Sequence, residues 1–333
     1  SACASNRPIN PAPHTMHCMG LAIDFSHSQD RPRESLLIMQ TMKDIPFTHQ
    51  YARVLSIAGS DSGGGAGIQA DLKTFSALGC YGMTAVTALT AQNTLGVQSI
   101  HGVPAAFLKT QLQSVLDDIG VDAVKIGMLH SPEVVEVVAW AIDHYRLKQV
   151  VLDPVMVATS GDRLIAEETV AVLVRELFPR VKLITPNLDE ANLLLKQSLT
   201  DVQALQPAAQ ALLDMGAKAV LLKGGHLPGD KLCDVLQLQG QEALHYESAR
   251  IHSRNVHGTG CSLSSAIATQ LALGHDVASA VVTARAFIRQ AIAQGATVHT
   301  GHGHGPLNHG FAPVVMQLKP LHGQDGSANP TAK

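Results

Sequence analysis

The chain has 333 residues, of which 46% are hydrophobic and 15% are charged, a composition typical of one large or two smaller α/β domains. The formal net charge of -3 and the pI near 6.6 provide no global basic field, so we expect neither nucleic acid nor membrane as a partner. Five cysteines without a CxxC pair, no signal-peptide pattern and no apolar run of about 20 residues predict a cytoplasmic protein.

Three regions differ in pattern along the chain. Residues 1–50 contain prolines, scattered histidines and no sustained periodicity, so we expect a poorly ordered extension there. Residues 51–312 have the regular pattern of a folded domain. The tail 313–333 loses that periodicity and becomes polar, which predicts a segment that is at least partly mobile.

Within the central region, short β-branched runs alternate with longer amphipathic stretches, the signature of parallel βαβ units. We expect strands at 54–58, 84–89, 123–127, 150–155, 183–185 and 219–223, with a further pair near 234–238 and 243–248. Helices are expected at 68–78, 132–145, 259–273 and 277–293, and in the remaining gaps. The pattern predicts an α/β fold with a mostly parallel sheet.

The first candidate site is the glycine-rich stretch 59–67, which follows a predicted strand. It lacks the lysine of a phosphate-binding Walker loop and the third glycine of a dinucleotide loop. Beside Asp61 and Asp71, it is typical of a loop that approaches a small substrate closely. A plain strand-to-helix turn is an equally good interpretation.

The second candidate is the start of the helix expected at 259–273. Backbone N–H groups of Gly258, Thr259, Gly260 and Cys261 would form an anion hole at the positive end of the helix dipole. The same field would lower the pKa of the Cys261 thiol, so that it could take a proton from an alcohol. The alternative is that Cys261 is a small buried hydrophobic residue.

Further polar side chains follow predicted strands, where the carboxyl ends of a parallel sheet face a binding crevice. Asp153 and Glu190 could hold a hydrated magnesium ion, although Glu190 could equally be a helix-start carboxylate. Lys223 could neutralise phosphate charge, or be a solvated lysine. Gln92 offers a donor and an acceptor that match an aminopyrimidine edge, or is simply polar surface. The histidines at 299–309 favour a glycine-rich closing loop over a metal site.

Several motifs together resemble the hydroxymethylpyrimidine/phosphomethylpyrimidine kinases of thiamine biosynthesis, members of the ribokinase-like superfamily. The resemblance runs from about residue 53 to 309. It rests on the segments AGSD at 58–61, GAGIQADLKT at 65–74, AQNT at 91–94, KIGML at 125–129, ITPN at 184–187, KGGH at 223–226 and HGTGC at 257–261.

The resemblance implies a ribokinase-like sheet flanked by helices on both faces, with ATP and Mg²⁺ as cofactors. It implies two phosphorylations, first of the hydroxymethyl group and then of the monophosphate, and a homodimer. Cys261 would be the base beside the GTG anion hole, and Asn187, Lys223, Gly258 and Gly260 would bind ATP. Expected substrate contacts are Gly59, Asp61, Asp71, Gln92, Met128 and Val155.

Two alternatives remain open. A pyridoxal or pyridoxine kinase shares the anion hole and the cysteine, but its ring lacks the amino donor and ring acceptor that Gln92 would pair with. A catalytically silent vitamin-binding protein would keep the fold without turnover. Some relatives carry a fused thiamine-phosphate synthase barrel, which we do not expect here because such a barrel needs about 200 residues or more.

Overall fold

The structure, a computed structural model, describes residues 47–156 and 165–321. The expected extension therefore lies almost entirely outside the described residues, as does most of the polar end of the tail. The division of the chain at residues 50 and 312 stays a prediction.

Nine strands form one mixed sheet in the order β10-β9-β8-β7-β6-β5-β2-β3-β4. Five neighbouring pairs, from β3 through β2 to β8, are parallel, and the pairs at both edges are antiparallel. The expected mostly parallel sheet is confirmed. The strands are β2 (Arg53–Asp61), β3 (Tyr81–Asn93), β4 (Gly96–Gly102), β5 (Ala123–Ile126), β6 (Val150–Leu152), β7 (Leu183–Ile184), β8 (Ala219–Leu222), β9 (Lys231–Leu238) and β10 (Leu244–Ala249).

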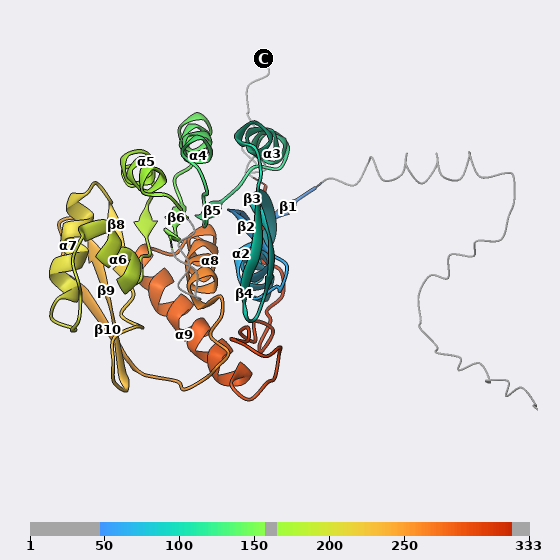
Figure 1. The fold of residues 1–333 in the computed structure, drawn as a ribbon. Coiled ribbons are helices and arrows are strands. Elements are labelled where there is room, and N and C mark those ends of the chain that lie inside the picture. Colours follow the sequence, from blue (N-terminus) through green and yellow to red (C-terminus); the bar gives the residue numbers. More distant parts are fainter. Residues whose placement is uncertain (1–46, 157–164, 322–333) are drawn as a thin grey trace, which may run out of the picture. The chain divides into compact units, whose positions relative to one another are not determined.

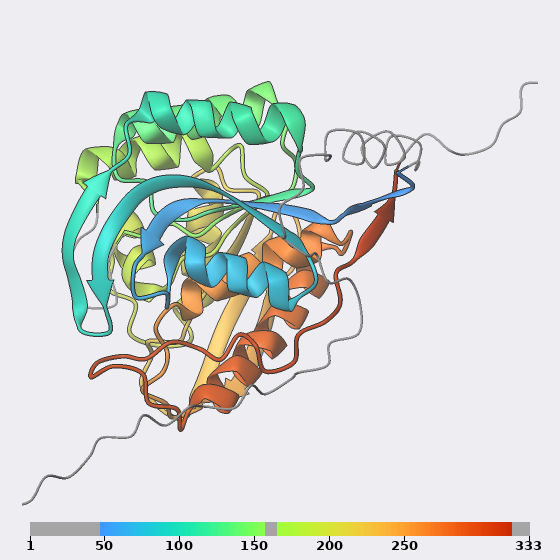
Figure 2. The same ribbon diagram turned by 90° about the vertical axis from the view of Figure 1, so that its right-hand side faces the viewer.

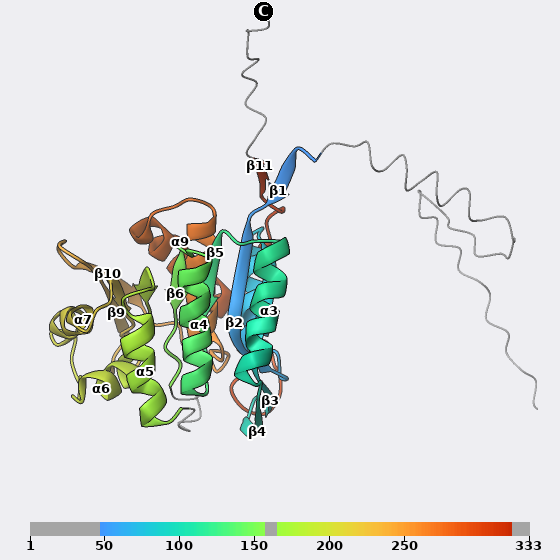
Figure 3. The same cartoon turned by 90° about the horizontal axis from the view of Figure 1, so that it is seen from above.

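Helices cover both faces of the sheet, as expected. Figure 1 shows α3, α4 and α5 over one face, with α8 and α9 over the other, and Figure 3 shows α3, α4 and α5 side by side. The helices are α2 (Gly67–Ala77), α3 (Ala105–Asp118), α4 (Pro132–His144), α5 (Glu167–Leu177), α6 (Leu188–Leu195), α7 (Leu205–Asp214), α8 (Thr259–Ala272) and α9 (Val277–Gly295). None of these described helices is long and apolar enough to cross a membrane.

Two apolar cores correspond to these two faces. One contains the buried side chains of α3 to α7, such as Leu112, Val138 and Leu212, against one side of the sheet. The other contains those of α2, α8 and α9, such as Phe75 and Ile267. Burial on both sides explains why β5 to β8 are short, mostly apolar runs, with Lys125 in β5 as the exception.

Local sequence signals start several helices where expected. Ser131 caps α4 by accepting a hydrogen bond from the Val134 N–H, with Pro132 in the first turn. Asn187 and Glu190 form a reciprocal capping box at the start of α6. Both signals are local, so they could be interpreted from the sequence alone.

The structure differs from expectation at β3. This strand continues to Asn93 and pairs with β4, which the sequence did not predict. Strand β4 is mostly exposed and polar, so it lacks the apolar alternation that marks a half-buried strand. Gln92 therefore lies in a strand of a β-hairpin and not in a loop.

A second small sheet was also missed. Strand β1 (His49–Tyr51) pairs antiparallel with β11 (Leu318–Pro320), so segments from the two ends of the described chain meet. Figure 2 shows these as the short blue and dark red strands that lie next to each other. Both are three residues long, too short to produce a period in the sequence.

Candidate active site

A pocket of about 1050 Å³ lies where the carboxyl ends of the parallel strands meet the start of α8. This is the crevice in which open α/β sheets bind ligands, and its volume suits a small heterocycle together with a nucleotide. Every residue expected in the site lines it except Asp71. Those residues are Gly59, Asp61, Gln92, Met128, Asp153, Val155, Asn187, Glu190, Lys223, Gly258, Thr259, Gly260 and Cys261.

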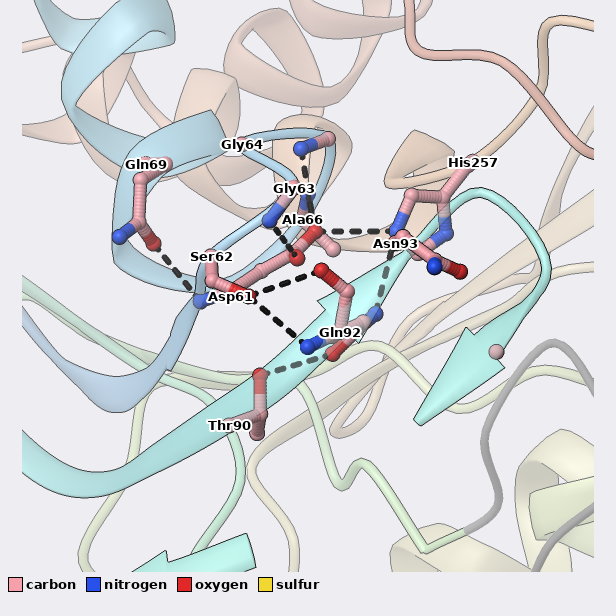
Figure 4. Close-up of polar contacts among 12 residues, drawn as sticks. Asp61, Ser62, Gly63, Gly64, Ala66, Gln69, Thr90, Gln92, Asn93 and His257 are labelled. Carbon is pink, nitrogen blue, oxygen red and sulfur yellow. Dashed lines mark hydrogen bonds and ion pairs between the residues drawn. The ribbon is translucent and has the colours of Figure 1, made fainter. Parts of the chain in front are cut away.

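At one end of this pocket, Asp61 organises the glycine loop that follows β2 (Figure 4). Its carboxylate accepts the backbone N–H groups of Gly63 at 2.8 Å, Gly65 at 3.0 Å and Ala66 at 2.8 Å. Burial acts to raise the pKa of Asp61, but hydrogen bonds from His257, Ala66 and Gly63 outweigh it and hold the pKa below its ordinary value. Asp61 therefore lines the pocket but uses its carboxylate on its own loop.

His257 joins this loop to β3 and to the start of α8. Its Nε2 lies 3.1 Å from Asp61 Oδ2 and 3.3 Å from Gln92 Nε2. The other end of the Gln92 carboxamide lies 3.1 Å from Thr90 Oγ1. Figure 4 shows the carboxylate, imidazole and carboxamide pointing toward one another from three segments of the chain.

Glycine is required where this loop meets the start of α8. Gly258 has a φ of 82°, and a Cβ there would overlap the carbonyl oxygen of Gly65. A Cβ on Gly65 would in turn overlap the His257 ring. The backbone of the glycine loop is therefore in direct contact with the backbone at the start of α8, and glycine at Gly65 and Gly258 permits this contact.

Asp71 does not reach the pocket wall, contrary to expectation. It is fully buried, and its carboxylate lies 3.0 Å from Lys125 Nζ and 2.6 Å from the hydroxyls of Ser56 and Ser265. The nearby Asp71 carboxylate, with Cys261 and Asp153, raises the pKa of Lys125 although burial acts in the opposite direction. Because these partners occupy both oxygens, Asp71 is positioned to hold Lys125 rather than to contact a substrate.

The start of α8 leaves donors open toward the pocket. The Thr259 N–H bonds to the Val256 carbonyl and the Ser262 N–H to the Gly258 carbonyl. The N–H groups of Gly258, Gly260 and Cys261 have no hydrogen-bond partner within the described residues, so only Thr259 among the expected anion-hole residues has its N–H engaged within the protein. Free donors at a helix N-terminus can form an anion hole.

The expected thiolate at Cys261 is wrong for this structure. Burial raises the pKa of the Cys261 thiol, and the Asp71 and Asp153 carboxylates add to the effect. The Lys125 ammonium and the Gly67 N–H oppose it without outweighing it. The helix terminus alone therefore does not ionise Cys261, because negative charges packed beside it favour the neutral form.

Another part of the pocket wall carries a cluster of charges, in which Asp153 is buried and Lys223 is partly exposed. Lys223 Nζ lies 2.9 Å from Asp153 Oδ1, which also accepts the Thr185 hydroxyl at 2.9 Å. A Cβ on Gly260 would stand 3.3 Å from Lys223 Nζ and 3.5 Å from Asp153 Oδ2. The lysine, this carboxylate and the anion hole therefore face one small volume.

Glu190 is a helix-start carboxylate that also faces the pocket. Its Oε2 accepts the Asn187 N–H at 2.8 Å, so it is a capping residue. It also lines the pocket. Burial raises the pKa of Glu190 to about 7, with the Asp153 carboxylate adding to the rise and Lys223 opposing it. A neighbouring cation would stabilise the ionised form of such a carboxylate.

Asp153 and Glu190 fit a magnesium ion that takes its remaining ligands from water and phosphate. Magnesium prefers one or two carboxylates with substrate oxygens over an all-protein cage. Within the described part of the chain, no group of three or more potential ligands forms such a cage. His299, His302 and His304 are therefore not part of a described metal cluster.

Sequence reasoning gave no role to several residues of this pocket. Lys125 is a lysine within the otherwise apolar strand Ala123–Ile126, a buried charge that could have been noticed. Arg250, Arg285 and Arg289 also line the pocket, from the segment after β10 and from α9. Their positions depend on the fold of the antiparallel edge, so no local signal marks them.

Comparison with known proteins decides the family. The sequence model of the phosphomethylpyrimidine kinase family matches residues 61–308. This chain belongs to the phosphomethylpyrimidine kinase family. It is 47% identical to the hydroxymethylpyrimidine/phosphomethylpyrimidine kinases of Rhizobium meliloti and Escherichia coli, over 78% and 77% of this chain and 97% and 96% of theirs. It is 50% identical to the Geobacter sulfurreducens thiamine biosynthesis bifunctional protein ThiED over 77% of this chain, but spans only 52% of that protein.

Solved structures agree with the family and confirm the ribokinase-like fold. A Clostridium difficile phosphomethylpyrimidine kinase has a TM-score of 0.64 and 41% identity, covering 72% of this chain and 99% of its own. The ADP complex of Bacillus subtilis pyridoxal kinase has a TM-score of 0.72 and 38% identity, covering 78% and 98%. Pyridoxal kinase, the alternative function that the sequence suggested, is therefore also similar in structure.

Proposed function

We propose that this member of the phosphomethylpyrimidine kinase family transfers the γ-phosphoryl group of ATP to 4-amino-5-hydroxymethyl-2-methylpyrimidine and then to the resulting monophosphate, in thiamine biosynthesis. One observation carries the proposal. A single pocket contains a carboxamide and also open helix N–H groups that lie beside a partly exposed lysine and buried carboxylates. The carboxamide can pair with the edge of a nitrogen heterocycle, and the N–H groups with the lysine can bind phosphoryl oxygens.

A Cβ on Gly59 would lie only 2.8 Å from Met128 Cε, so glycine lets the Met128 side chain pack directly against the backbone there. The acceptor would lie against this part of the pocket wall, near Val155 and Gln92. Gln92 would pair with the ring nitrogen and amino group. The hydroxymethyl arm would then extend toward Cys261 and the anion hole.

In the first step, the hydroxyl oxygen forms a bond to the γ-phosphorus while the bond from that phosphorus to the ADP oxygen breaks. The N–H groups of Gly260 and Cys261 stabilise charge on the transferring oxygens, and Lys223 adds a positive charge. The hydroxyl proton passes to Cys261, which must be ionised to accept it. Because the Asp153 carboxylate helps to raise the pKa of this thiol, a cation on Asp153 would favour the thiolate.

Asp153 and Glu190 would hold magnesium, and Asn187 with Lys223 would border the nucleotide phosphates. Magnesium supplies charge neutralisation between the phosphates of ATP. In the second step the acceptor is a phosphate oxygen that is already ionised near neutral pH, so no base is needed. The two acceptors therefore differ in their need for Cys261.

A pyridoxal kinase activity is the second candidate, and the likeness to solved pyridoxal kinases favours testing it. A catalytically silent vitamin-binding protein is the third. A homodimer and a cytoplasmic location remain predictions carried over from the family resemblance and the composition.

The test is ADP release by the purified chain with magnesium and ATP, using hydroxymethylpyrimidine, its monophosphate and pyridoxal as separate acceptors. We expect turnover of both pyrimidines, with a higher kcat/KM than for pyridoxal. Preference for pyridoxal would move the assignment to the vitamin B6 kinases. Binding of the pyrimidine without turnover would favour the catalytically silent vitamin-binding protein.

A further inference from the structure

The polar groups around Gln92 can be assigned by counting hydrogens. The ionised Asp61 carboxylate only accepts hydrogen bonds, and hydrogen bonds from His257 and backbone N–H groups hold its pKa below the ordinary value despite burial. His257 Nε2, at 3.1 Å, must therefore carry a hydrogen and donate it to Asp61.

The Gln92 atom that lies 3.3 Å from this nitrogen is Nε2, which is also a donor. A donor facing a donor is repulsive. The carboxylate can accept from His257, but the amide nitrogen has no lone pair to offer it. An oxygen at this position of Gln92 would instead accept from the imidazole, sharing the single Nε2 hydrogen with Asp61 in a bifurcated bond.

Thr90 leads to the same conclusion from the other side. Its hydroxyl has one hydrogen, and the carbonyl oxygen of Ser60, an acceptor only, lies 2.8 Å away. The hydrogen therefore points to Ser60, and a lone pair of the hydroxyl faces Gln92 Oε1 at 3.1 Å. A half-turn of the carboxamide, whose two ends have nearly the same shape, removes both conflicts at once.

We propose that His257 is a positioning residue that, with Thr90, fixes the polarity of the Gln92 carboxamide, with oxygen toward His257 and nitrogen toward Thr90. This inference deepens the proposed function and rests on it. The remaining hydrogen and lone pair of the amide are then presented to the pocket in one fixed order. That order selects a ring edge with an acceptor and a neighbouring donor, as in an aminopyrimidine, and against edges that lack the amino donor.

The backbone around His257 is held independently of its ring. The His257 N–H bonds to the Gly305 carbonyl at 3.1 Å, and His257 forms a parallel bridge with Pro306. A side-chain substitution at His257 therefore leaves the main-chain bonds that place this segment, and its effects act through the two side chains that the ring contacts, Gln92 and Asp61.

Steady-state kinetics of His257→Leu tests the proposal. We expect KM for hydroxymethylpyrimidine to rise about tenfold, the equivalent of one lost hydrogen bond, while kcat and KM for ATP stay within about twofold. The preference over pyridoxal should fall by the same factor as KM rises. His257→Gln, which keeps an N–H donor, should recover most of the affinity, and exposed His275→Leu outside the pocket is the matched control.

A double-mutant cycle separates positioning from general disturbance. In a Gln92→Ala background, His257→Leu should cause no further rise in the pyrimidine KM. Additive effects, an unchanged pyrimidine KM in the single variant, or an equal loss for pyrimidine and pyridoxal would each overturn the proposal. Thr90→Val should weaken pyrimidine binding in the same way, and Thr90→Ser should restore it.

A measurement without turnover keeps this inference separate from the proposed function. In ¹⁵N NMR spectra of the labelled protein, His257 Nε2 should be of the protonated type and lose its signal in His257→Leu. A bare Nε2 with its proton on Nδ1 would refute the assignment. If wild type fails to phosphorylate hydroxymethylpyrimidine, the proposed function falls, and this spectrum still decides how His257 faces Gln92.

Discussion

Two regions of the pocket differ in how far the protein itself satisfies their polar groups. The carboxylate oxygens of Asp61 and of the buried Asp71 accept hydrogen bonds from protein donors. In the phosphoryl region, the N–H groups of Gly258, Gly260 and Cys261 lack partners within the described residues, and the pKa of Glu190 is raised to about 7. The first region is satisfied by the protein apart from the hydrogen and lone pair that Gln92 presents to the pocket, whereas the second becomes satisfied only with its charged ligands.

This difference implies different consequences of mutation. Removing a protein partner of Asp61 or Asp71 leaves a buried carboxylate unsatisfied, so the free energy of unfolding should fall. Disturbing the start of α8 removes interactions that form only with ligand, so catalysis should fall more than stability.

The largest expected effect on stability comes from Lys125→Met. It leaves Asp71 as a buried carboxylate without its cation, and the free energy of unfolding should fall by about 3–5 kcal/mol. Denaturant unfolding measures the loss. Lys125→Met combined with Asp71→Asn should recover part of it, since no charge is then buried alone. If the single variant were as stable as wild type, the buried Asp71 carboxylate would not depend on its ion pair with Lys125.

The next effect, on catalysis, comes from Gly258→Ala. Gly258 and Gly274 both have positive φ, at 82° and 94°, but an added Cβ meets Gly65 only at Gly258. Both variants should lose about 1–2 kcal/mol of stability from the backbone conformation. Only Gly258→Ala should also lose kcat, by about 10²–10³-fold, because the start of α8 must move away from the phosphoryl oxygens.

Equal kcat values in these two alanine variants would contradict this account of the anion hole. The assay is phosphoryl transfer at saturating ATP and pyrimidine, with unfolding curves measured in parallel so that stability and turnover are compared on the same protein.

The smallest effect is a pH dependence of stability from Glu190. Its pKa in the folded chain is about 7, above the ordinary 4.5, so the folded state holds the proton more tightly. The contribution is fully present below pH 4.5 and is lost as pH rises through about 7, with a total of about 1–3 kcal/mol.

Glu190→Gln should remove this slope, which unfolding midpoints between pH 5 and 8 would reveal. Magnesium and ATP should also flatten it in wild type, because a cation at Glu190 favours the carboxylate. A wild-type slope identical to that of the variant would mean that Glu190 titrates normally.

Much of the fold could be predicted because its signals are local. Short apolar runs marked β5 to β8, and Ser131 with Pro132 marked the start of α4. Strands β1 and β11 were missed because they pair with each other from the two ends of the described chain. Strand β4 was missed because it is mostly exposed and lacks apolar alternation.

The sequence predicted which residues lie in the pocket better than it predicted what each residue does. Its motifs identified Asp153, Lys223 and Gly258, which all line one pocket. The position of Asp71 depends on Lys125, 54 residues away, and the thiol pKa of Cys261 depends on burial and on charges from three other segments. Neither quantity is encoded near the residue itself.

We propose that one pocket phosphorylates two acceptors and needs Cys261 for only one of them. The most direct test is Cys261→Ala, with turnover measured separately on hydroxymethylpyrimidine and on its monophosphate. We predict a loss of about 10²–10⁴-fold for the alcohol and a loss of less than about tenfold for the monophosphate, which needs no base. Equal losses for the two acceptors, or no loss for the alcohol, would contradict the account.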